Sequence, residues 1–194
     1  MEKIGEIISV ESSFIVAEGS VNMLPSLGSL IKTNDSSCYY FLVVSLFTES
    51  RTPGRIPIAY GKQIDVLKKE QPQIFELMKW GFRAVPVGKK GETGQLLLPE
   101  HLPEIHSLLY LVGSEELKEI FGNSSFIDTL FCIDSDKVPE RDEAIMRLIK
   151  NYISFLESDE RSDALLDVAN KITLILRDDY AVLKRFIGVL GAYK

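Results

Sequence analysis

The sequence predicts an α+β protein in which a small antiparallel β-barrel is followed by a bundle of α-helices. Three observations lead to this prediction. Short runs of β-branched and aromatic residues, separated by turn residues, fill the first 112 positions. From Ser114 onward, apolar residues recur instead at the 3.6-residue period of a helix. The chain has 194 residues, enough for two such units, which we place at residues 1–112 and 113–194.

The first strands are predicted from short β-rich runs. Strands are expected over residues 4–10 and 14–16, and the three residues "ESS" between them favour a hairpin. A third strand should end the segment "LPSLGSLIKT", after Pro25 and Gly28. The segment "CYYFLVVSLFTES" is the densest in aromatic and β-branched residues, so it predicts the strongest strand of the chain.

The rest of the barrel region is predicted to mix strands with one helix. "IPIAYG" is expected to be a strand, and its Pro57 places it at an edge or at a strand end. One short inserted helix is expected within residues 65–80, where Pro72 marks a start. "FRAVPVG" and "QLLLP" then predict two strands joined by a hairpin tip, "KKGETG".

The second half is predicted to be helical throughout. Ser114 and Ser125 are candidate N-caps, and Pro139 is expected near the start of the clearest helix. Apolar stripes at helical spacing predict helices over residues 114–123, 124–133, 138–159, 161–179 and 180–190. Such helices bury their stripes only by packing together or against the barrel. Residues 103–114 are the expected join between the two units.

Composition indicates a cytoplasmic globular protein. No apolar run approaches the roughly 20 residues needed to cross a bilayer, and the first residues lack the apolar centre of a signal peptide. Cys38 and Cys132 lie far apart in the sequence, which favours two buried thiols in a reducing compartment over a disulfide.

The net charge of −6 argues against tight autonomous binding to nucleic acid, because such binding depends on neutralising phosphates. The charge is uneven. Residues 1–112 hold 11 basic and 12 acidic side chains, whereas residues 113–194 hold 11 and 16. A local basic strip in the first half is an alternative, and its foremost candidates are Arg51, Arg55, Lys89 and Lys90. The further basic residues of this strip are Lys62, Lys68, Lys69, Lys79 and Arg83. Four aromatic residues could then stack on bases, or instead fill the barrel core: Tyr39, Tyr40, Phe41 and Trp80.

No catalytic or cofactor-binding constellation is recognisable. The stretch "VPVGKKGETGQLLLP" has glycines and lysines, but no lysine follows its last glycine and no helix start is available for a phosphate. His101 and His106 lie among glutamates and are candidate metal ligands, although two prolines make their segment irregular. We therefore predict no cofactor, no resident metal and no enzymatic activity. An enzyme with a site near these histidines, where barrel and bundle meet, is the remaining alternative.

The first 112 residues resemble the HAS barrel, the N-terminal barrel shared by ATP synthase ring subunits and HerA-type DNA translocases. The matching segments are "IGEIISVESSFIVA", "LPSLGSLIKT", "GRIPIAYG" and "FRAVPVG", and "LLLPEHLPEIHSLLYLVGSEEL" resembles the exit from the barrel in HerA-like proteins. In that family the barrel is a collar that assembles a ring and, in HerA-type proteins, docks a nuclease. The resemblance implies structural roles for Gly5, Gly28, Gly54, Arg55, Gly61 and Gly88.

The chain departs from that family after the barrel. It has no phosphate-binding loop, and its remaining residues are too few for an ATPase motor. The resemblance therefore implies a non-catalytic assembly or docking module, a homo-oligomer acting in DNA processing with a separate HerA-type ATPase or nuclease. A nucleic-acid-binding barrel is the alternative from another class.

Overall fold

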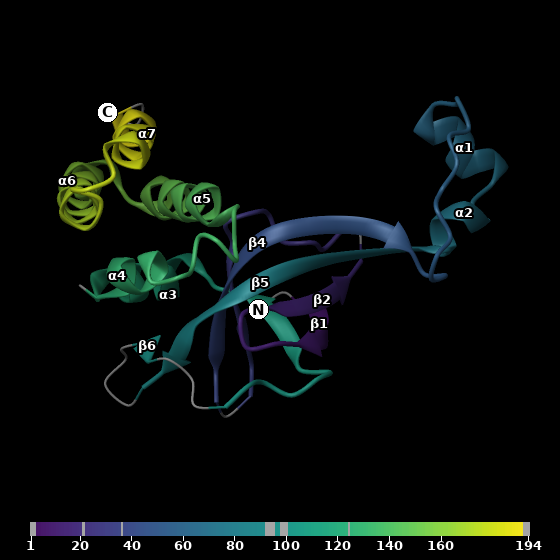
Figure 1. Ribbon diagram of the computed structural model, residues 1–194, viewed down its shortest axis with the longest axis horizontal. Helices are drawn as coiled ribbons and strands as arrows, with labels where there is room; N and C mark the ends of the chain where they lie inside the picture. The colour runs from purple at the N-terminus through teal and green to yellow at the C-terminus, as the bar shows by residue number, and fades with distance from the viewer. Residues whose placement is uncertain are drawn as a thin grey trace.

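Six antiparallel strands close into a barrel (Figure 1). The computed structural model describes residues 3–20, 22–35, 37–91, 96–97, 101–123 and 125–191. Around the barrel the order is β2-β1-β7-β3-β4-β5, and β5 pairs with β2 to close it. The strands are β1 (Lys3–Val10), β2 (Ile15–Gly19), β3 (Leu30–Thr33), β4 (Tyr39–Ser50), β5 (Met78–Lys90) and β7 (Leu108–Leu111). The predicted α+β class and the antiparallel barrel are confirmed.

The first six residues of β4, 39–44, are buried on both faces, which explains why this part of the strand is apolar without interruption. Tyr39, Phe41 and Val43 belong to the core inside the barrel, together with residues of the other five strands. The alternate residues Tyr40, Leu42 and Val44 belong to a second core, shared with the helices. Because successive side chains of a strand point to opposite faces, one apolar run serves two cores.

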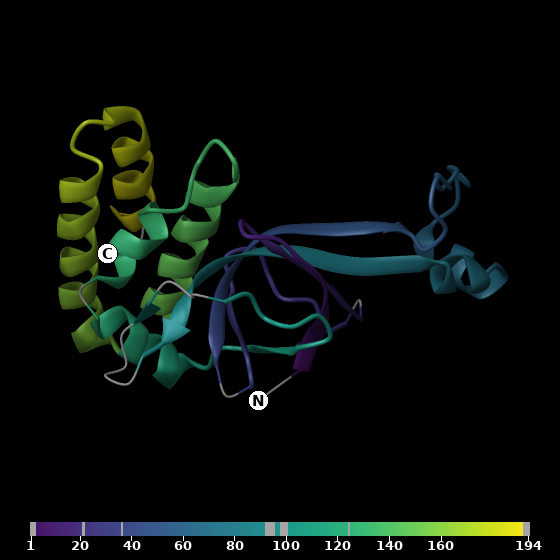
Figure 2. The ribbon, with the colours of Figure 1, turned by 60° about the horizontal axis from the view of Figure 1, so that its bottom comes forward.

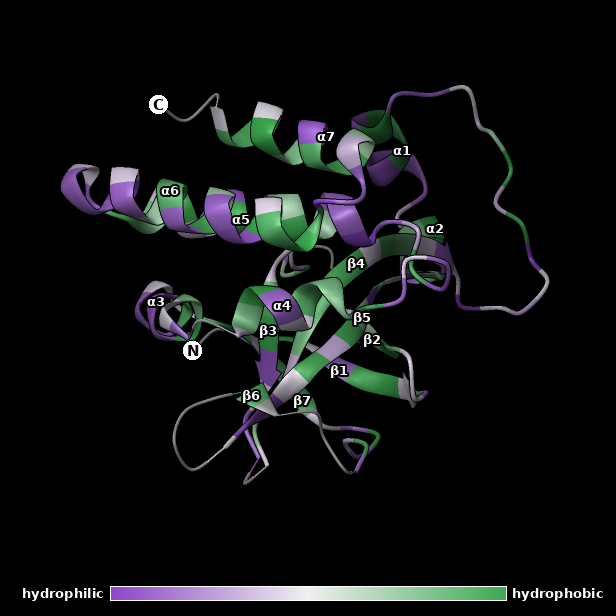
Figure 3. Cartoon of the chain, turned by 60° about the vertical axis from the view of Figure 1, so that its left-hand side comes forward, coloured by the Kyte–Doolittle hydropathy of each residue, from purple (hydrophilic) through white to green (hydrophobic). Residues whose placement is uncertain are grey.

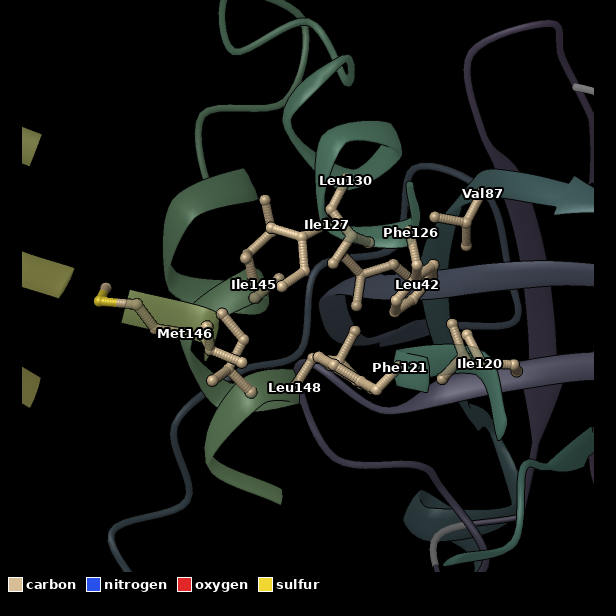
Figure 4. Packing of buried hydrophobic residues seen from close by; sticks show 14 of the residues in the cluster. Leu42, Val87, Ile120, Phe121, Phe126, Ile127, Leu130, Ile145, Met146 and Leu148 are labelled. Atoms are coloured by element: carbon tan, nitrogen blue, oxygen red, sulfur yellow. The ribbon is translucent and has the colours of Figure 1, made fainter. Parts of the chain in front are cut away.

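The helices cover the barrel on the β4 side. They are α3 (Ser114–Gly122), α4 (Phe126–Phe131), α5 (Arg141–Phe155), α6 (Ser158–Ile175) and α7 (Tyr180–Gly191). They pack on one another, and α5 also contacts β4. Figure 4 shows Leu42 and Val87 of the barrel in one cluster with Ile120 and Phe126 of the helices. None of the described helices combines the length and the apolar character needed to cross a bilayer.

Two predictions about the segment between β4 and β5 are wrong. The expected strand "IPIAYG" is absent, because residues 51–63 form neither helix nor strand. Pro57 has no N–H to donate to a neighbouring strand, and none of the described strands lies beside it. Instead of one helix there are two, α1 (Ile64–Glu70) and α2 (Gln73–Glu76), with Pro72 between them. Met78, expected on the helix, begins β5.

The segment expected to join the two units is itself part of the barrel. Within residues 103–114, β7 pairs with both β1 and β3, and Leu109 is fully buried inside the barrel. The prediction missed this strand because only four residues pair and only Leu109 among them is buried. The cap of α3 also differs, since Gly113 rather than Ser114 occupies the N-cap position. Strand β6 (Leu96–Leu97) pairs with β5 as expected, but the predicted hairpin tip between them falls largely on residues 92–95, outside the described residues.

Candidate docking surface

Residues 51–77 form an arm at the end of the β4–β5 hairpin. Figure 2 shows this hairpin leaving the barrel, with α1 and α2 at its tip and helices α3–α7 at the opposite end of the molecule. Neither α1 nor α2 has a buried residue. The arm therefore projects away from both hydrophobic cores.

The arm exposes large apolar side chains. Ile56 is 83% exposed and Ile58 is 70% exposed, and four further apolar side chains of the arm are exposed: Tyr60, Ile64, Val66 and Leu77. Figure 3 shows hydrophobic stretches along the loop that leads to α1. Single exposed apolar residues are ordinary on a protein surface, but a cluster of this kind is typical of an interaction site.

The part of the arm before α1 lacks regular backbone partners among the described residues. Gly54 and Gly61 have φ angles of 74° and 65°, which bound the apolar stretch with turns. Between residues 56 and 62 no backbone–backbone hydrogen bond forms with the described residues. Ile56 and Ile58, together with Ile74, Leu77 and Met78, line a small cavity of about 120 Å³. The apolar stretch thus lies over a hollow rather than over a packed core.

The arm is also basic, in contrast to the whole chain. It carries five basic side chains against three acidic ones, a net charge of +2, whereas the chain has −6. Lys62 pairs with Glu70 inside the arm, and Lys68 lies 5.9 Å from the centre of the Phe75 ring. Arg55 and Lys69 are exposed and form no ion pair with a described residue. Apolar surface bordered by unpaired cations suits a partner that is apolar and acidic.

The four residues predicted to bind nucleic acid do not come together. Arg51 and Arg55 lie on the arm, whereas Lys89 and Lys90 lie at the other end of β5. Arg51 pairs with Glu18 at 2.5 Å, and Lys90 lies 3.6 Å from Glu119. The aromatic residues do not form a stacking surface either, since three of them are buried: Tyr39, Tyr40 and Phe41. Trp80 is half-buried.

This arrangement predicts weak binding to single-stranded nucleic acid. A fluorescent oligonucleotide titrated at low salt should bind the wild type weakly. The K89E/K90E double variant should bind it with the same affinity within twofold, because Lys90 already faces a carboxylate. A salt-dependent affinity that disappears on this charge reversal would instead restore the nucleic-acid-binding alternative.

The two histidines are exposed and do not meet in a metal site. His106 has a φ of 73°, and its Nδ1 lies 2.6 Å from Oε1 of Glu6 on β1. His101 is exposed on a loop. Among the described residues, no three His, Cys, Asp or Glu side chains gather as metal ligands.

Both cysteines are free thiols. Cys38 is half-buried, whereas Cys132 is exposed, so the prediction that Cys132 is buried is wrong.

A polar cluster between the barrel and α3 was not predicted. Lys32 of β3 donates to both carboxylate oxygens of Glu116, at 2.7 and 2.6 Å, and the Tyr40 hydroxyl donates to the same carboxylate at 2.5 Å. No sequence spacing could reveal it, because the partners are 84 and 76 residues apart. Burial favours a higher pKa for Glu116, but the hydrogen bonds from Lys32 and Tyr40 outweigh it and hold the pKa below its usual range.

This pKa shift predicts a pH-dependent contribution to stability. A carboxyl group with a depressed pKa in the folded state stabilises the protein fully above its unfolded pKa of about 4.3, and the contribution is lost as the pH falls through the lower folded pKa. The difference in unfolding free energy between the wild type and Glu116→Gln should therefore be largest near neutral pH and shrink below about pH 4. Urea denaturation across this pH range measures it. A difference that does not change with pH would show that the ionised carboxylate is not what stabilises the junction.

The glycines singled out by the resemblance to the HAS barrel differ in their surroundings. A Cβ at Gly5 would lie 2.9 Å from the backbone oxygen of Glu18, and one at Gly28 would lie 2.5 Å from Cβ of Arg147. Gly54 and Gly61 have positive φ and open surroundings, so they shape turns only.

Comparison with known proteins adds nothing to these assignments: no protein-family model and no curated protein matches the chain.

Proposed function

We propose that this chain is a non-catalytic assembly and docking module, and that the arm of residues 51–77 binds its protein partner. The exposed, unpacked apolar stretch around Ile56 and Ile58 is the observation that carries the proposal. Burying apolar surface contributes about 25 cal/mol per Å². The apolar surface at the tip of the projecting hairpin therefore contributes to stability only when a partner covers it.

The barrel supports the setting of the proposal. A closed six-stranded antiparallel barrel is compatible with the resemblance to the HAS-barrel collar of HerA-type DNA translocases. In this setting the module serves DNA processing in the cytoplasm by docking, and the motor or nuclease that acts on the DNA is carried by a separate chain. The segment "GRIPIAYG", which contributed to the resemblance, lies within the arm.

Site-specific photo-crosslinking tests the docking role. A photoreactive amino acid placed at Ile58 in the native host should give one dominant protein adduct, which mass spectrometry identifies. The matched control is the same amino acid at Ile105, which is 54% exposed and lies outside the arm. Equal or absent adducts at both positions would contradict the docking function.

The arm is expected to serve binding rather than folding. The double variant I56S/I58S should change the free energy of unfolding by less than about 0.5 kcal/mol, because both side chains are already in water. In the same variant, a photoreactive amino acid placed elsewhere on the arm, such as at Val66, should no longer give the protein adduct. Thermal denaturation followed by circular dichroism gives the stability. A large loss of stability would mean that the stretch is packed in solution and is not a free docking surface.

A further inference from the structure

A second surface with complementary character lies among the helices. Helices α3, α5 and α6 border a shallow, open groove of about 310 Å³. The apolar side of the groove consists of Tyr152, Leu156 and Ala164, and its polar side consists of Lys118, Glu160 and Asp163. The Tyr152 ring is fixed in place by stacking on Phe121, with ring centres 4.0 Å apart.

The surroundings of this groove are acidic. The hydrogen bond to Glu160, 3.2 Å from the ammonium, raises the pKa of Lys118, and the charges of Glu115 and Glu157 raise it further. Asp163 forms no ion pair with a described residue. Residues 113–194 as a whole carry 11 basic and 16 acidic side chains. Among the lining residues one lysine stands against two carboxylates, a net charge of −1. The nearby Arg161 donates to the Leu156 oxygen, so Asp163 is the lining carboxylate that is left for a cation from outside.

The arm and the groove are complementary, because both are partly apolar and their charges are opposite. The two surfaces cannot meet within one chain. Figures 1 and 2 show the arm and the helices at opposite ends of the molecule. The complementary surfaces can therefore meet only between two copies. A contact between different surfaces of identical chains is head-to-tail, and it produces a ring or an open chain.

We propose that the arm of one copy seats Ile56 and Ile58 in the α3–α5–α6 groove of a neighbouring copy, with Arg55 beside Asp163. This inference rests on the proposed docking function and names a second copy of the chain as the occupant. The isoleucines cover the apolar side made by Tyr152 and Ala164, and the arm's cations meet the acidic side. Since the charges at such a contact are partly exposed, association weakens as salt is added.

Light scattering coupled to size exclusion, over a dilution series, tests the contact. The wild type is expected to form assemblies larger than a dimer that dissociate on dilution. An arm variant, I56S/I58S, and a groove variant, D163K/A164R, should each be monomeric alone. Mixed in equal amounts, they should form a dimer and nothing larger, because the pair retains one intact arm and one intact groove.

Charge exchange provides the second measurement and guards against misfolded variants. Arg55→Glu should weaken self-association by about tenfold, and adding Asp163→Arg in the same chain should restore it. Asp178→Lys, an equal charge change on an exposed residue outside the groove, should have no effect.

Three results would overturn the inference: a wild type that is monomeric at every concentration, self-association lost in the arm variant but kept in the groove variant, or a mixture that stays monomeric. In each case an Ile58 adduct with a different protein would leave the docking function standing. No adduct at all would remove both.

Discussion

Replacing Gly28 with alanine is expected to destabilise the protein by about 3 kcal/mol or more, because two penalties add. The φ angle of Gly28 is 80°, where an L-residue costs roughly 1–2 kcal/mol. The added Cβ would also lie 2.6 Å from the backbone oxygen of Ala144 on α5, and such overpacking costs about 1–3 kcal/mol. The Gly28 N–H donates to the Val43 oxygen at 2.8 Å, which holds the loop in place and prevents it from moving aside.

Gly54→Ala is the matched control for this prediction. Gly54 has a similar φ of 74°, but no atom lies within 4 Å of the added Cβ. Its loss should therefore be limited to the conformational penalty of about 1–2 kcal/mol. Urea denaturation of both variants separates the two contributions. Equal losses at the two positions would show that the loop and α5 are not packed closely in solution.

Glu116→Ala is expected to cost about 2–3 kcal/mol of unfolding free energy, by leaving the Lys32 ammonium without its partner at the junction. Removing one partner of a buried ion pair costs about 3–5 kcal/mol. The expected loss is smaller here because the side chains of Lys32 and Glu116 are 12% and 23% exposed, and solvent screens their charges in part. The Tyr40 hydroxyl also loses its acceptor.

The control for this second prediction is Glu119→Ala, on the same helix. Glu119 is 72% exposed and lies 3.6 Å from Lys90, so its removal should cost less than about 0.5 kcal/mol. A further variant, K32M/E116L, replaces the charges by apolar groups and should recover most of the lost stability. If it does not, the cluster stabilises the junction through specific hydrogen bonds rather than by avoiding an unpaired charge.

Elements with a strong apolar period were predictable from the sequence. The run of residues 38–50 predicted β4 because aromatic and β-branched side chains favour a strand. The spacing of Ile145, Leu148, Ile149 and Ile153 predicted α5, and all four are buried. The short strand β7 was not recognised, because it carries too few buried residues to show a period.

The candidate site was only partly predictable. The sequence contains the apolar stretch at Ile56 and Ile58, but its pattern suggested a paired strand rather than an exposed one. Whether a strand pairs depends on a neighbour elsewhere in the chain, which local propensity does not describe. Likewise, the sequence showed that the second half is acidic, whereas packing of the helices decided that the acidic face of α6 lies beside Tyr152 of α5 and Lys118 of α3.

By itself, then, the sequence determined the elements whose side chains alternate or recur with a clear period, and the separation of charge between the two halves. The tertiary structure alone decided that β7 joins β1 to β3 in the barrel, that Glu116 meets Lys32 and Tyr40, and that the arm and the groove lie at opposite ends of the molecule. The physical reason is distance along the chain. Propensity and periodicity act over a few residues, whereas strand pairing, buried charge pairs and surface placement depend on residues that only folding brings together.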